Sequence, residues 1–142
     1  MSAEENERAV RAIFGSMDQQ KNMNTLDDYA SSAYKVHVPG APTLDCAGMK
    51  QFALSFFGAI PNLKHDLEDV FAAGDRVAVS LRLYGKNTGA LVGPAGTIPA
   101  SGRDVDFEAV NIWRFENGKV AEHWISFDQL GFLQQIGALP GA

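Results

Sequence analysis

One histidine lies in the middle of an alternating segment near the end of the sequence, residues 120–127 (VAEHWISF). Side chains alternate between the two faces of a strand, so His123 shares a face with apolar neighbours while Glu122 lies on the other face. In the preceding alternating segment, residues 105–115, Asn111 likewise falls on the face without charged residues. The pattern predicts that His123 and Asn111 both point into the interior.

An inward imidazole suits general acid or base catalysis, because its unperturbed pKa of about 6.5 can be moved across neutrality by burial or by a hydrogen-bond partner. The alternative is a core histidine whose hydrogen-bonding groups are satisfied within the protein. The spacing alone leaves both interpretations of His123 open.

Three further ionisable residues bear on the chemistry of such a site. His37 lies within a short extended segment and either lines the mouth of a pocket or is solvated. His65 lies among charges in "LKHDLED" and is predicted at the surface. Asp128 stands where the last strand becomes a helix, so it is either the helix N-cap or a carboxylate at a pocket rim. The histidines show no metal-ligand spacing, and no metal site is expected.

The elements that position these residues follow from periodicity. Apolar residues at helical spacing predict a helix over about 3–20, a short helix after Asn24 or Thr25, and a third that ends before Pro61. Alternation predicts a short strand around 34–38 and four longer antiparallel strands after residue 63. Asn117-Gly118 suits a tight hairpin turn. A closing helix precedes Gly137, and residues 87–104, rich in Gly, Pro and Ala, are predicted to form a long loop.

Helices segregated to one side of a curved antiparallel sheet define an α+β fold in a single domain, residues 1–142. Such a sheet encloses a cone-shaped space that can hold an apolar small molecule. The aromatic helix that carries Phe52, Phe56 and Phe57 supplies either plain core or a wall of that space.

Composition limits the partners. The net charge is −5 without a basic cluster, so nucleic acid is not expected. No apolar run is long enough to cross a bilayer. The acidic start of the chain lacks the features of a signal peptide, and the single cysteine, Cys46, suits a reducing compartment, so we expect a cytoplasmic protein.

Two stretches, "LYGKNTGALVG" (83–93) and "WRFENGKVAEHWISFDQLGFLQQIG" (113–137), closely resemble the SnoaL-like polyketide cyclase family of the nuclear-transport-factor-2-like superfamily. The resemblance implies a cone-shaped α+β barrel, commonly a homodimer, and cofactor-free chemistry on a hydrophobic, ring-bearing substrate. In the family's aromatic polyketide cyclases an aspartate on the last strand removes a proton α to a carbonyl, and an intramolecular aldol reaction closes a ring.

The match differs at several site positions. Ile125 stands where the family has its aspartate, and Asn111 and Asn87 stand where histidines are often found. His37, His123 and Asp128 match positions where those residue types recur in the family.

Two hypotheses follow. In the first, the chain is an enzyme in which His123 is the base or acid, with Asp128 and His37 as further catalytic candidates. Asn111 and Asn87 then donate to a carbonyl or enolate oxygen. The remaining substrate-binding candidates are Trp113, Ile125, Phe56, Phe57 and Tyr34. In the second, the chain is a ligand-binding or scaffold dimer that has lost its base. An interaction module, which would require an exposed apolar patch, is the third alternative.

Overall fold

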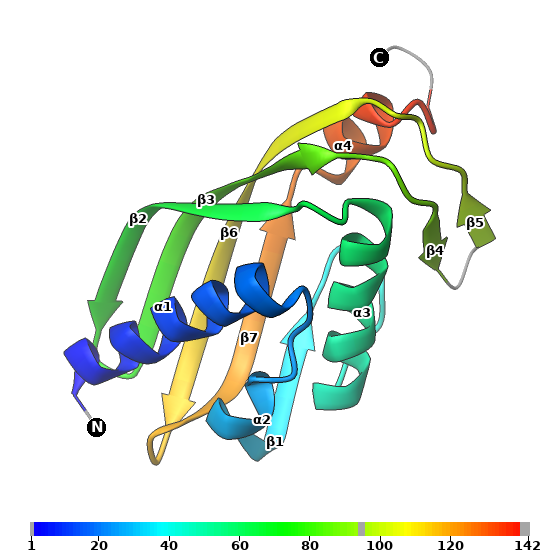
Figure 1. The fold of residues 1–142 in the computed structure, drawn as a ribbon. Helices are drawn as coiled ribbons and strands as arrows, with labels where there is room; N and C mark the ends of the chain where they lie inside the picture. The colour runs from blue at the N-terminus through cyan, green and yellow to red at the C-terminus, as the bar shows by residue number, and fades with distance from the viewer. Residues whose placement is uncertain (1, 94–95, 140–142) are drawn as a thin grey trace.

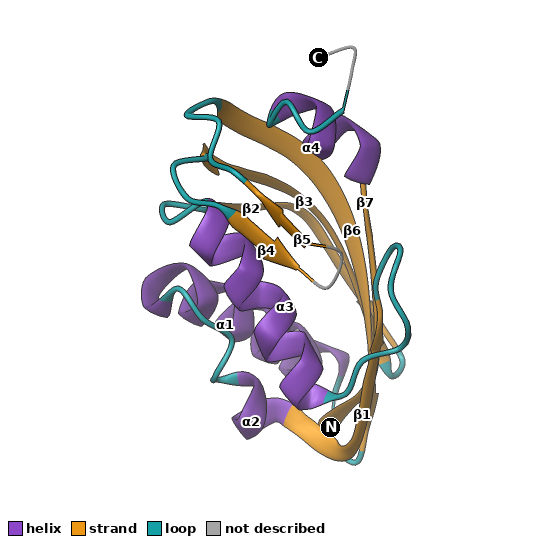
Figure 2. Ribbon diagram, turned by 90° about the vertical axis from the view of Figure 1, so that its right-hand side faces the viewer, coloured by secondary structure: helices purple, strands orange, loops and turns teal. Residues whose placement is uncertain are grey.

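A curved five-stranded sheet forms the body of the protein in the computed structural model, which describes residues 2–93 and 96–139 (Figure 1). The strand order is β1-β7-β6-β3-β2. The bounds are Ala30–His37 (β1), Lys64–Ala73 (β2), Arg76–Lys86 (β3), Asp104–Glu116 (β6) and Lys119–Phe127 (β7). The helices α1 and α3 pack on the concave face of this sheet, and α4 lies at one end of it (Figure 2). The predicted α+β class is confirmed.

One pairing differs from the prediction. All neighbouring strands are antiparallel except β1, which runs parallel to β7 with Val36 opposite His123. The parallel pairing places β1 next to the strand that carries the candidate histidine.

The helices begin and end where the sequence supplies caps. The first helix, α1 (Ala3–Gln20), starts with a capping box between Ser2 and Glu5. A single-turn helix, α2 (Leu26–Tyr29), follows it. The third helix, α3 (Cys46–Ala59), is capped by Asp45, and Pro61 follows its end. The last helix, α4 (Gln129–Gln135), is capped by Asp128, which accepts the Gly131 backbone N–H at 2.9 Å.

The hairpin turn between β6 and β7 adopts the expected positive φ angles, +52° at Asn117 and +78° at Gly118. Burial alternates along β6, where Asn111 and Trp113 are buried and Val110 is exposed. The predicted inward orientation of Asn111 and His123 is confirmed by their exposed fractions of 5% and 1%.

The predicted loop over residues 87–104 is partly wrong, because it contains a small two-stranded sheet, β4 (Leu91–Gly93) and β5 (Gly96–Ile98). The segment before β4 is bonded to the end of α3, because the Gly89 N–H donates to the Ala59 carbonyl at 3.1 Å. The short strands could not be recognised from alternation because each spans only three residues. No helix within the described ranges is long and apolar enough to cross a membrane.

Candidate active site

A cavity lies between the concave face of the sheet and the helices α1 and α3, with an empty volume of about 580 Å³ that includes space open to solvent. Most of its wall is aliphatic or aromatic, and it includes the predicted wall residues Phe56, Phe57 and Ile125 together with Phe52. Apart from the Trp113 indole, the polar side chains among the described lining residues are those of His65, Asn111 and His123. The chemistry of the cavity therefore depends on few groups in surroundings that strengthen electrostatic interactions.

His123 is held on three sides. Its Nε2–H donates to Asn111 Oδ1 at 2.5 Å, and its Nδ1 accepts the Tyr34 hydroxyl at 3.1 Å. The Trp113 indole stacks on the imidazole with 3.5 Å between ring centroids and 18° between planes. Burial lowers the pKa of His123 well below its ordinary value and raises that of Tyr34, so the imidazole is neutral and the phenol remains a donor. Tyr34 thus acts on the cavity through His123.

Two N–H donors on residues that line the cavity lack a partner among the described residues. Asn111 offers its Oδ1 to His123, and no hydrogen bond connects its Nδ2 to any described residue. The Trp113 Nε1 is buried and has no partner within the described part of the chain. An unpaired N–H that is fully buried, as Trp113 Nε1 is, costs about 1–3 kcal/mol.

His65 also lines the cavity, and the prediction that it lies at the surface is wrong. Its side chain is 5% exposed, and its Nδ1 lies 2.6 Å from Asp18 Oδ1. The missed signal is the alternation of Leu63, His65 and Leu67 with charged residues, which places His65 on the apolar face of β2.

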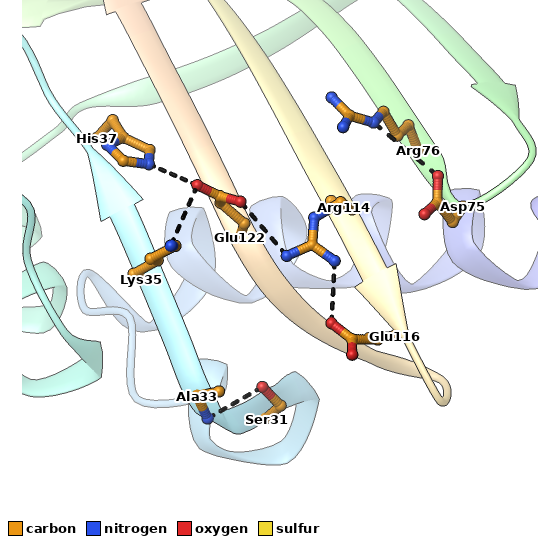
Figure 3. A network of polar contacts seen from close by, with 9 residues as sticks. All are labelled: Ser31, Ala33, Lys35, His37, Asp75, Arg76, Arg114, Glu116 and Glu122. Atoms are coloured by element: carbon orange, nitrogen blue, oxygen red, sulfur yellow. Dashed lines mark hydrogen bonds and ion pairs between the residues drawn. The ribbon is translucent and has the colours of Figure 1, made fainter.

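His37 lies outside this cavity, on the outer face of the sheet (Figure 3). Its Nε2 is 2.7 Å from Glu122 Oε2, and Glu122 also pairs with Lys35 and Arg114. The hydrogen bond from His37, followed by the Lys35 charge and the Arg114 hydrogen bond, lowers the pKa of Glu122. His37 lines a separate hollow on that face with Trp124, on which it stacks.

Asn87 and Asp128 also lie away from the cavity lining. The buried Asn87 amide donates to the carbonyls of Ala59 and Gly89 and accepts from the backbone and hydroxyl of Ser101. Its hydrogen-bonding capacity is used to fix the loop before β4. Asp128 caps α4, as one of the two alternatives had it.

Comparison with known proteins gives a consistent result. A family model for SnoaL-like polyketide cyclases matches residues 7–136. The aklanonic acid methyl ester cyclase DnrD of Streptomyces peucetius is 38% identical over 64 residues, which are 45% of this chain and 41% of DnrD. The matched part therefore spans less than half of that relative.

Among solved structures, AclR from Streptomyces galilaeus superposes with a TM-score of 0.84 at 22% identity, covering 98% of this chain and 100% of AclR. TsrD from Streptomyces laurentii gives a TM-score of 0.81 at 24% identity, with 98% and 99% of the two chains covered. At these identities the likeness establishes the fold, while the reaction must be argued from the site.

Proposed function

Because the chain belongs to the SnoaL-like polyketide cyclase family, we propose that it closes a ring in a hydrophobic, carbonyl-bearing small molecule by cofactor-independent acid–base chemistry in the cavity. The observation that carries this proposal is the pair of unpartnered donors, Asn111 Nδ2 and Trp113 Nε1, on residues of a mostly apolar wall. A carbonyl oxygen is the ligand group that completes such a pair.

The reaction needs a donor for the oxygen that gains charge when a C–H proton α to a carbonyl is removed. Asn111 and Trp113 supply N–H groups for that oxygen, and their low-dielectric surroundings make each donor more effective than it would be in water. The Phe56 and Phe57 side of the cavity holds the rings of the substrate and excludes water.

The geometry favours a positioning role for His123. Both of its ring nitrogens are engaged, and its Nε2–H fixes the Asn111 amide so that Nδ2 is left for the ligand. Its assignment as the base stays a prediction, which requires the Tyr34 hydroxyl to release Nδ1.

The competing hypothesis is a binding or scaffold protein of the same fold, and the observation that favours it is Ile125. This residue lines the cavity at the position of the family's aspartate and can take no proton. The two hypotheses differ in whether a bound ligand is converted. The expected homodimer is compatible with either and stays a prediction.

The test uses aklanonic acid methyl ester, the compound in the name of the relative DnrD. We expect the protein to convert it in the presence of a metal chelator to a product of altered retention, followed by chromatography and mass spectrometry. Asn111→Leu should lower kcat/KM by about 10²- to 10³-fold, the usual cost of one such donor. Val110→Leu, the adjacent residue on the outer face of β6, is the matched control. Saturable binding without conversion would refute the cyclase and support the binding protein.

A further inference from the structure

His65 and Asp18 form a His–carboxylate pair where the end of α1 meets the start of β2. Both carboxylate oxygens of Asp18 lie 3.1 Å from the His65 backbone nitrogen, and Oδ1 lies 2.6 Å from Nδ1. The Asp18 side chain is 20% exposed and reaches toward solvent, whereas His65 is 5% exposed. Asp18 therefore fixes both the backbone and the ring of His65 from behind.

This arrangement determines the tautomer. A carboxylate only accepts hydrogen bonds, so the proton of the neutral imidazole lies on Nδ1 and the lone pair on Nε2. No hydrogen bond connects Nε2 to any residue within 2–93 or 96–139. The ring lies 5.5 Å from that of Phe14 and 6.2 Å from that of Phe57, both of which line the cavity.

The two histidines of the cavity thus differ in what they can do. Both nitrogens of His123 are bonded within the protein, whereas His65 keeps one nitrogen with a free lone pair and has a carboxylate to stabilise the imidazolium that protonation would create. A residue that accepts a proton needs that second arrangement.

We propose that His65 is the proton acceptor of this cavity and that Asp18 is its positioning residue; this inference rests on the cyclase function proposed above. His65 Nε2 takes a proton from a C–H group of the substrate, and the electron pair of that bond forms the enolate. The nucleophilic carbon of this enolate forms a C–C bond to a second carbonyl carbon of the same molecule. The π pair of that carbonyl moves to its oxygen, which receives the proton back from His65. No oxidant or cofactor is consumed.

The position of His65 also constrains the substrate. The Phe14 ring contacts both sides of the cavity, with centroid distances of 5.5 Å to the His65 ring and 5.8 Å to the Trp113 ring. A molecule that places an oxygen at Asn111 and Trp113 and an acidic C–H at His65 must reach from the β6 side of the cavity to the β2 side. The proposed roles therefore require a conjugated ketone, in which charge formed near His65 is delocalised to the distant oxygen.

The experiment compares His65→Gln, Asp18→Asn and the double variant, with Asp66→Asn as matched control because Asp66 is an exposed carboxylate on the same strand. With aklanonic acid methyl ester, we expect His65→Gln to lower kcat by at least about 100-fold with little change in KM. Asp18→Asn should also lower kcat, and the double variant should lose no more than His65→Gln, because Asp18 acts through His65. Asp66→Asn should match the wild type.

A second measurement does not depend on turnover. Nitrogen-15 NMR of the wild type at about pH 8, where an ordinary histidine is neutral, should show His65 with its proton on Nδ1. In Asp18→Asn the amide can donate to Nδ1, so the tautomer should shift toward Nε2–H.

The outcomes separate the two claims. Wild-type kcat in a folded His65→Gln variant, or an Nε2–H tautomer in the wild type, would overturn the role of His65 and leave the cyclase function standing. Binding of the ester by the wild type without conversion would instead overturn the cyclase function, and the catalytic role of His65 with it.

Discussion

Replacement of His123 by glutamine should flatten the acid side of the stability profile. The native imidazole is buried and its pKa is lowered well below the ordinary value, so the folded state binds no proton there while the unfolded state does below about pH 6.5. Stability is therefore present above the unfolded pKa and is lost as the pH falls below it. Linkage sets the loss at about 1.4 kcal/mol per pH unit, until the folded pKa is reached.

Between pH 7 and pH 5 this amounts to about 2 kcal/mol for the wild type. The carboxylates with lowered pKa, such as Glu122, also lose their stabilising effect as the pH falls, but they do so below about pH 4.5, outside this window. Urea unfolding at pH 7, 6 and 5 gives the free energies. The His123→Gln variant should lack the loss of about 2 kcal/mol that His123 causes between pH 7 and pH 5, whereas a His37→Gln control should retain it. Equal slopes for wild type and His123→Gln would show that His123 titrates normally and refute the buried, neutral imidazole.

Two predictions concern the elements that frame the cavity. Asp128→Ala should lower the free energy of unfolding by about 1 kcal/mol through loss of the α4 cap, whereas Asp128→Asn should cost only a few tenths; equal losses in thermal melts would rule out the capping role. Gly89→Ala should destabilise by about 1–3 kcal/mol, because the new Cβ would lie 1.9 Å from the Gly58 carbonyl oxygen, while Gly93→Ala meets no neighbour and serves as its control.

The sequence was sufficient for the inner face of the last hairpin. Strict alternation over β6 and β7, with charged residues confined to one face, determined that Asn111 and His123 point inward. Their hydrogen bond could not be predicted, because it depends on the strand register that sets Trp113 opposite His123 and Asn111 opposite Ile125. The hairpin turn could be predicted because Asn117 and Gly118 tolerate positive φ angles that few other residues adopt.

Interactions between distant segments escaped sequence reasoning. The parallel pairing of β1 with β7 joins residues near 35 to residues near 122, and no local pattern encodes it. It brings Tyr34 to His123, which changes a candidate base into a residue with both nitrogens engaged. In the same way, the contact between Asp18 and His65 spans 47 positions, so the charged neighbours of His65 in "LKHDLED" do not indicate it.

The contacts of Tyr34 with His123 and of Asp18 with His65 determine which imidazole of the cavity is available as a base, given that position 125 is an isoleucine. The concave sheet is covered by α1 and α3, so the cavity has a wall formed by α1 and β2 as well as the wall formed by β6 and β7. A proton acceptor can stand on either wall, provided that a partner fixes its ring. On the β7 wall the only imidazole is committed to Asn111 and Tyr34; on the β2 wall Asp18 leaves one nitrogen of His65 available. An isoleucine at position 125 is therefore compatible with the proposed catalysis, because the proposed base, His65, stands on the other wall of the same cavity.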